Sequence, residues 1–336
     1  GDRVVALRTG WPDGEVREEA SCVPVGWLPR LALVERAGVH AGLAYCRCVE
    51  RLLGIELPER GAWLRILLAE WSRIAEHWRR FAGIAHVLDA ALPRALAVEG
   101  HVRAQRGLEL LSGARDGTGT LRIGGVRHAL DEATAGRLRA AVPVLRDGIR
   151  ELAGLTARSP WFAARLRGVG LLTQGDCLAL GITGPGLRAA GVPLDLRKED
   201  PGQGYGRVEF DVPVGESGDA YDRLLVCLAE VEQSANIVDQ CLDAIAALGP
   251  GPVDVADPRV RWPSRQRAAA RVEDRIHHYK GVTEGPRVPA GEAYAAVESP
   301  IGELGCYAVA DGGPLPVHVH LRSPQAFHLV ALERMA

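Results

Sequence analysis

The strongest pattern in the sequence is a long amphipathic helix, predicted between Gly61 and Ala91. Apolar residues recur there every three or four positions, which is the period of one face of an α-helix. The repeating residues are Trp63, Ile66, Leu67, Ile74, Trp78, Phe81, Ala85 and Leu88. At 1.5 Å per residue the helix would be roughly 40 Å long. A rod of this length can organise a whole domain, so we expect a mainly helical core around it.

Apolar periodicity predicts the remaining elements as well. Helices are expected over residues 41–55, 101–112, 132–157, 218–248, 265–280 and 326–336, with short helical pieces inside residues 166–200. Alternating apolar residues and turn signals predict strands. These are expected at residues 2–8 and 207–214, in a hairpin over 120–128 that turns at Gly124-Gly125, and in a three-stranded meander over 291–321.

These elements together indicate an α+β fold that is mainly α-helical, in a single domain over residues 1–336. Four parts follow one another along the chain: an N-terminal sheet remnant and loop (1–40), a helical core with the hairpin (41–248), a Pro-rich linker (249–264), and a C-terminal helix with the β-meander (265–336). The sequence has no internal repeat of 20–50 residues, which excludes a solenoid.

Composition excludes several classes of protein. Hydrophobic residues make up 47% and charged residues 24% of the chain, which is typical of a globular protein. The net charge is only -2, so the basic field typical of nucleic-acid binding is missing. No stretch reaches the ~18 consecutive apolar residues of a transmembrane helix, and residues 1–20 do not resemble a secretory signal. We therefore expect any membrane association to depend on partner proteins.

The cysteines and glycines predict no cofactor held by this chain. The seven cysteines are sparse and odd in number, as expected of reduced buried thiols. Cys46 and Cys48 are two residues apart on a helix, about 200° around its axis, so one metal ion would not easily bind both. No Cys-x-x-Cys pair supports a nickel or cluster site. The glycine-rich residues 181–186 lack the Gly-Lys-Ser/Thr of a phosphate loop and indicate tight packing instead.

Two polar clusters have both a functional and a structural interpretation. Glu70, Arg73 and His77 fall at positions i, i+3 and i+7 of the long helix, and Arg80 extends the same face. They could form a proton-handling chain, or they could be an ordinary solvated face. His277 and His278 pose the same choice, although adjacent histidines point in different directions.

Ten sequence blocks together resemble the D subunit of the NADH–quinone oxidoreductase known as complex I, and more distantly the large subunit of [NiFe] hydrogenases. The resemblance covers nearly the whole chain. The blocks are residues 43–54, 58–60 with 69–77, 121–126, 167–170, 178–184, 187–192, 210–215, 219–223, 283–285, and 297–305 with 311–313.

The resemblance implies a hydrogenase-large-subunit fold with long central helices and small flanking antiparallel sheets. It implies a peripheral position on the cytoplasmic side of the plasma membrane, against an iron–sulfur small subunit of the B type, a C-like partner subunit and membrane-arm subunits. A quinone and the partner's iron–sulfur cluster are implied, and no cofactor in this chain. It also favours a buried polar network at the matching positions, which are Glu70, Arg73, His77, Arg122, Arg188, Asp195, Arg197, Glu298 and Glu303.

The chain departs from the family at the residues associated with chemistry. A family Arg-Met/Leu-Asp-Tyr motif, whose Tyr holds the quinone headgroup, corresponds to Arg30-Leu31-Ala32-Leu33, and the chain as given begins after a family loop that bears a His. A further family His is replaced within residues 117–120, and an Arg-Glu-Arg-Glu stretch is replaced around residues 99–103. The hydrogenase nickel ligands, two Cys-x-x-Cys pairs, are absent, and residues 34–40 correspond to the surroundings of the first pair.

The leading hypothesis is therefore a divergent subunit of a complex I-like NADH–quinone oxidoreductase. With an iron–sulfur small subunit it would form the quinone-site region, where electron transfer is coupled to proton movement. The alternatives are a non-catalytic structural or assembly paralogue, favoured by Leu33, and a degenerate energy-converting hydrogenase subunit without its nickel–iron centre. No complete active site is expected in this chain alone.

Overall fold

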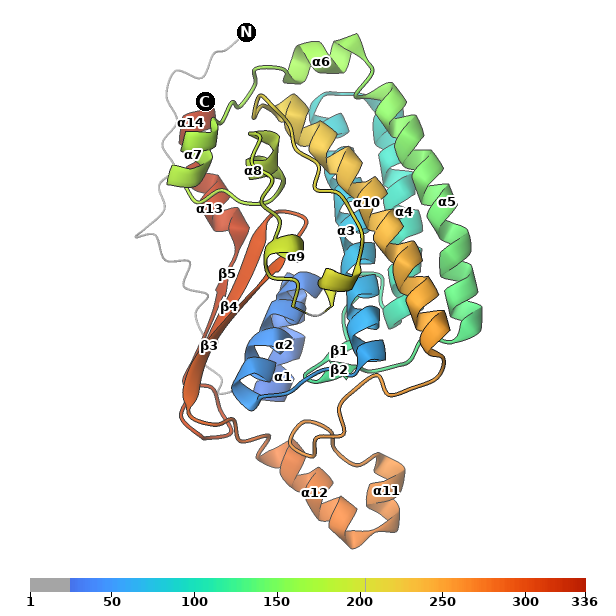
Figure 1. Cartoon of the computed structure of the whole chain (residues 1–336), viewed down its shortest axis with the longest axis vertical. Coiled ribbons are helices and arrows are strands. Elements are labelled where there is room, and N and C mark those ends of the chain that lie inside the picture. Colours follow the sequence, from blue (N-terminus) through green and yellow to red (C-terminus); the bar gives the residue numbers. More distant parts are fainter. Residues whose placement is uncertain (1–24, 203) are drawn as a thin grey trace.

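Four long helices form the body of the protein. The computed structural model describes residues 25–202 and 204–336 (Figure 1). In it, helices α3 (Glu59–Val87), α4 (Ala91–Ser112), α5 (Glu132–Leu155) and α10 (Ala220–Leu248) pack side by side, each against two of the others. The mainly helical α+β fold expected from the sequence is confirmed. The strand expected at residues 2–8 and Cys22 lie outside the described residues.

Helices α3 and α4 approach each other closely because glycines of α4 face tryptophans of α3. A Cβ atom at Gly107 would lie 2.1 Å from the Trp71 ring, and one at Gly100 would lie 2.3 Å from Trp78. The Trp71 Nε1 donates a hydrogen bond of 2.8 Å to the Ala104 carbonyl oxygen, so the buried indole is satisfied. Large rings packed against bare backbone allow this close approach of the two helices.

A helix that is buried over most of its length, α2 (Val39–Leu53), lies between this bundle and a sheet. Strands β3 (Gly291–Glu298), β4 (Glu303–Ala310) and β5 (His318–Arg322) form an antiparallel meander in the order β3-β4-β5. The predicted meander is confirmed, and β3 and β4 pack on α2 (Figure 1). The predicted hairpin is also confirmed, with β1 (Leu121–Arg122) paired to β2 (Gly125–Val126).

Short elements surround this framework. At the start lie α1 (Trp27–Val34) and η1 (Glu35–Ala37). Between α5 and α10 lie α6 (Pro160–Leu166), α7 (Gln174–Ala179), α8 (Pro185–Ala189), α9 (Leu196–Glu199) and η2 (Tyr205–Arg207). The C-terminal part adds α11 (Arg265–Ala270), α12 (Val272–Thr283), α13 (Pro324–Val330) and α14 (Leu332–Met335). Within the described part of the chain, no helix combines the length and hydropathy that a membrane crossing needs.

Three details of the predicted elements were wrong. The strand expected at residues 207–214 is extended but unpaired, because side chains of α10 satisfy its backbone: Gln240 and Gln233 accept from the Glu209 and Asp211 amides at 2.9 and 3.1 Å. The helix expected over residues 265–280 breaks at Arg271, which is extended, into α11 and α12. Helix α4 begins ten residues before the expected position 101, and it tolerates Pro93 because that residue lies in its first turn.

Candidate functional site

A buried network of charged side chains lies where α3, α8, α9, α10 and the end of β3 meet. Its members are each at most 5% exposed, and they are Glu70, Arg73, His77, Arg188, Asp195, Arg197, Glu230 and Glu298. Buried charges are tolerated only when they are paired and hydrogen-bonded, so the pairing of each group determines what the network can do.

At one end of the network, Glu70 receives several donors. Its carboxylate accepts from Arg73 Nε at 3.2 Å, from Arg197 at 3.1 Å, and from the hydroxyl groups of Tyr205 and Ser234 at 2.7 Å each. Burial opposes the charge, but Arg73 and Arg197 outweigh it and lower the pKa of Glu70 to about 2. Glu70 is therefore a permanent anion. Arg197 extends the network further with a two-bond pair to Asp195 at 3.0 and 2.7 Å.

At the other end, Arg188 holds carboxylates from two distant parts of the chain. It donates to Glu230 Oε1 at 2.9 and 2.7 Å and to Glu298 Oε1 at 2.9 Å. Glu230 also lies 2.8 Å from His77 Nε2. Burial raises the pKa of Glu298 despite the nearby arginines, whereas Arg188 and His77 overcome burial and lower the pKa of Glu230. Glu298 is thus the carboxyl group most able to take up a proton.

The charges of the network nearly cancel. Among the described residues joined in it by hydrogen bonds, four are carboxylates and three are guanidinium groups. These seven groups sum to one negative charge when Glu298 is ionised and to zero when Glu298 binds a proton. Arg80 lies beside the network but donates elsewhere, to Cys227 Sγ at 2.9 Å and to the Pro300 carbonyl oxygen at 2.8 Å. One proton can therefore enter or leave without unpairing an arginine.

Two sequence-predicted residues lie outside this network. The Arg122 side chain is exposed, because Leu121 and Ile123 on either side of it face the core and a strand alternates its faces. Glu303 is half-buried at the start of β4, where its carboxylate accepts from Tyr294 at 2.8 Å and pairs with Arg322 at 3.1 Å. Arg322 therefore supplies the counter-charge of Glu303, and Glu303 needs no arginine of the network.

Sequence reasoning missed Glu230, Ser234 and Tyr205, which complete the network. Glu230 and Ser234 lie four residues apart on the buried side of α10, among Val231 and Ala235. A charged and a hydroxyl side chain within an otherwise apolar stripe could have indicated a buried network, because a buried polar group requires a hydrogen-bond partner. Tyr205 follows a glycine-rich segment and gave no such signal.

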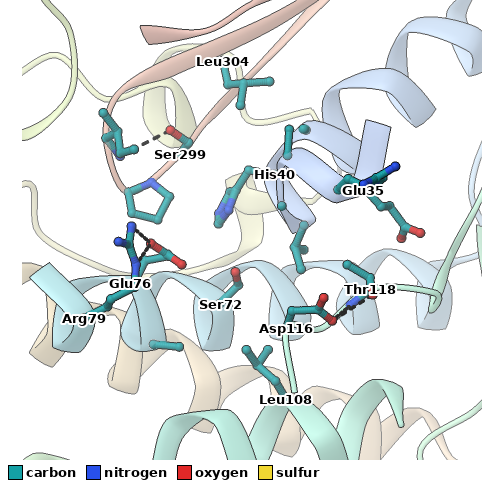
Figure 2. A pocket seen from close by; sticks show the side chains of 18 of the residues that line it. Glu35, His40, Ser72, Glu76, Arg79, Leu108, Asp116, Thr118, Ser299 and Leu304 are labelled. Carbon is teal, nitrogen blue, oxygen red and sulfur yellow. Dashed lines mark hydrogen bonds and ion pairs between the residues drawn. The ribbon is translucent and has the colours of Figure 1, made fainter. Parts of the chain in front are cut away.

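A cavity of about 460 Å³ lies between α3, the start of α2 and the turn after β3 (Figure 2). Among its lining residues, Glu76 pairs with Arg79 at 2.7 Å, and Asp116 accepts from the Thr118 hydroxyl at 2.8 Å. Glu35 Oε2 accepts from the Gly119 amide at 3.1 Å, and burial raises the pKa of Glu35.

His40 connects this cavity to the charged network. It lines the 460 Å³ cavity and also a small pocket of about 20 Å³ that it shares with Arg197, Glu298 and Tyr205. Burial, and then the positive charge of Arg73, lower the pKa of His40 to about 3, so its imidazole is neutral. Its Nε2 is buried without a hydrogen-bond partner. Figure 2 shows the ring in the space bordered by Ser299, Glu76 and Ser72.

The other candidate groups do not converge on a ligand. The six described cysteines are free and buried, and the part of the chain that the structure describes has no cluster of three or more His, Cys, Asp or Glu side chains fit to hold a metal ion. His277 and His278 contact separate linker carbonyl oxygens, those of Pro258 and Pro263, at 3.0 Å each. Both histidines therefore tie the linker to α12. Leu33 is 42% exposed on α1.

Comparison with known proteins decides the family. Residues 98–336 match the family described as respiratory-chain NADH dehydrogenase, 49 Kd subunit. The chain belongs to this family. The D 1 subunit of the NADH-quinone oxidoreductase of Streptomyces avermitilis is 40% identical over 310 residues, which cover 87% of this chain and 69% of that protein. The D subunit of the NADH-quinone oxidoreductase of Nocardia farcinica is 39% identical over 357 aligned residues, covering 100% of this chain and 78% of the relative. The hydrogenase-large-subunit type of fold expected from the resemblance is the fold of this family.

Proposed function

We propose that this chain is the D-type subunit of a membrane-associated NADH–quinone oxidoreductase and that it forms the quinone-site region with partner subunits. The observation that carries the proposal is a cavity next to a buried charged network in a member of this subunit family. His40 lines this cavity and also the small pocket at the edge of the network. A cavity of a few hundred Å³ with a few convergent polar groups is the usual form of a small-molecule site.

The network supports a role in handling protons. Reducing a quinone to its quinol takes two electrons and two protons, and we expect the electrons to come from an iron–sulfur cluster of the small subunit. This chain then contributes cavity walls and groups that hold a proton. Glu298 suits that task, since burial raises its pKa and its carboxylate is bonded to Arg188, which also pairs with Glu230. Perturbed carboxyl groups beside a cavity are typical of functional sites.

The family also indicates the partners and the location. We propose that the chain binds a B-type iron–sulfur small subunit and a C-like subunit, and that this assembly docks on membrane-arm subunits at the cytoplasmic face of the plasma membrane. Exposed apolar side chains on α12, including Val272, Ile276 and Tyr279, are typical of a surface that a neighbouring protein covers.

Purification from the native membrane tests the proposal. An affinity-tagged copy of the chain should co-purify with a cluster-bearing small subunit and with membrane subunits, and the preparation should transfer electrons from NADH to a short-chain quinone. Recovery of the chain alone, or of a complete assembly that oxidises NADH without reducing quinone, would contradict it.

A second candidate function is a structural subunit that handles no quinone. Leu33 favours it, because this side chain has no hydrogen-bond donor at the position of the family's Tyr. In that case the tagged chain would co-purify with its partners, while quinone reduction by the assembly would be insensitive to every substitution in the cavity. Replacing cavity residues in the purified assembly therefore separates the two candidates.

A further inference from the structure

On the basis of the proposed function, we propose that His40 is the hydrogen-bond partner of the quinone headgroup in the 460 Å³ cavity. The resemblance assigns that role to a tyrosine, but the corresponding position is Leu33. The proposal thus names a different residue, on a different element, as the group that orients the substrate.

The first argument is the state of the His40 side chain. His40 is 6% exposed and lines the cavity, and its Nε2 atom has no hydrogen-bond partner. Buried polar atoms in proteins are nearly always hydrogen-bonded, so such an atom at a cavity wall is a ready contact for a ligand oxygen. The cavity's other histidine, His101, is already used, since its Nδ1 lies 2.9 Å from the Ala75 carbonyl oxygen.

The second argument is the direction of α2. His40 is the second residue of this 15-residue helix, and Gly38, Val39 and Ala41 line the same cavity wall. A helix N-terminus carries a partial positive charge and free amide groups. Negative charge that develops on a headgroup oxygen as electrons arrive is stabilised at such an end. The helix and the imidazole therefore favour the same oxygen.

The third argument is the charge of the rest of the lining. Three acids face the cavity, but Glu76 is paired with Arg79, Asp116 is bonded to Thr118, and Glu35 is mostly buried with a raised pKa. Three arginines, Arg36, Arg79 and Arg115, line the cavity as well and offset these acids, and the rest of the lining mixes apolar side chains such as Ala75, Leu304 and Leu321 with polar, uncharged ones. A neutral, flat headgroup with polar oxygens matches this combination better than a charged metabolite does.

The experiment uses the assembled complex and a short-chain ubiquinone. His40→Phe removes the hydrogen bond and keeps a ring, so the KM for the quinone should rise about tenfold, the effect of one lost hydrogen bond. His40→Gln keeps a donor and an acceptor and should recover most of the affinity. His86→Gln, an exposed histidine near the end of α3, is the matched control and should leave the KM unchanged.

Photolabelling gives a readout that does not depend on turnover. A photoreactive azidoquinone added to the wild-type complex should label the peptide around residues 38–42, and excess ubiquinone should prevent it. Labelling confined to other peptides would overturn the proposal, even if His40→Phe fails to assemble. An unchanged KM in an assembled His40→Phe complex would also overturn it and leave the proposed function standing. A wild-type complex that cannot reduce quinone would instead refute the proposed function itself.

Discussion

Replacing Arg188 with alanine should destabilise the protein strongly. The guanidinium group is fully buried and bonds Glu230 twice, Glu298 once and the Leu194 carbonyl oxygen once, all within 2.9 Å, and it lies 3.5 Å from Asp195. Arg188→Ala leaves these carboxylates without their shared counter-charge. Removing one partner of a buried ion pair costs about 3–5 kcal/mol. An unfolding entropy of about 2.1 cal/mol/K per residue then lowers the Tm by about 4–7 °C.

The loss of stability in Arg188→Ala should depend on pH, because the carboxyl groups left without their arginine can take up protons. Without the arginine, the folded-state pKa values of Glu230 and Glu298 rise, and a group with a raised folded pKa contributes stability that is lost as the pH rises. The difference in the free energy of unfolding between wild type and Arg188→Ala should therefore be larger at pH 8 than at pH 5.5. Urea unfolding followed by circular dichroism at the two pH values measures it.

The control is Arg79→Ala, which removes an exposed arginine of α3. Arg79 pairs with Glu76 at 2.7 Å, but its side chain is 61% exposed, so the loss should stay within about 1 kcal/mol at both pH values. If Arg188→Ala were no more destabilising than this control, or if its effect were independent of pH, the buried pairing described above would be refuted.

Three further outcomes are expected. Glu70→Gln should make stability less dependent on pH below about pH 5. In the wild type, burial is outweighed by the arginine partners that lower the pKa of Glu70 from 4.5 to about 2, so the wild type loses roughly 3 kcal/mol of stability as the pH falls from about 5 to 2. An equally steep dependence of the urea midpoint on pH in the variant would argue against this. Gly107→Ala should lower the free energy of unfolding by about 1–3 kcal/mol, because the added methyl group collides with the Trp71 ring. Gly83→Ala, at a helical position with open space, should raise it by about 0.5–1 kcal/mol. Equal effects of the two substitutions would exclude the close packing of α4 on Trp71. Metal analysis of the chain separated from its partners should find no stoichiometric nickel, iron or zinc, since the described residues contain no ligand cluster; nickel at one per chain would contradict this.

The sequence predicted the framework because its long elements have a strong period of their own. The 29-residue helix α3 was found to within a few residues, and so were the hairpin and the meander. One failure has a clear physical cause, which is competition from side chains of another element. Residues 207–214 have a strand pattern, yet the amides of Glu209 and Asp211 bond glutamine side chains of α10 rather than a neighbouring strand.

The candidate site was predicted only in part, for a similar reason. The spacing of Glu70, Arg73 and His77 placed three groups on one face of a helix, but it did not indicate whether that face was solvated. The answer lies in partners more than 100 residues away, such as Arg197 and Glu230. Arg122 was expected in the network from the resemblance, and it lies outside it because strand alternation directs its side chain outward.

A comparison with a second buried ion pair indicates what the network is for. Arg65 and Glu50 form a bidentate pair at 3.0 and 2.5 Å that also bonds the hairpin backbone at Gly124 and Gly125. That pair fixes a turn. Stability alone does not explain the larger network, because well-packed apolar residues generally match or exceed buried ion pairs. What the network adds is Glu298, whose pKa burial raises and which lines the small pocket shared with His40, so a proton taken up there leaves every arginine of the network paired.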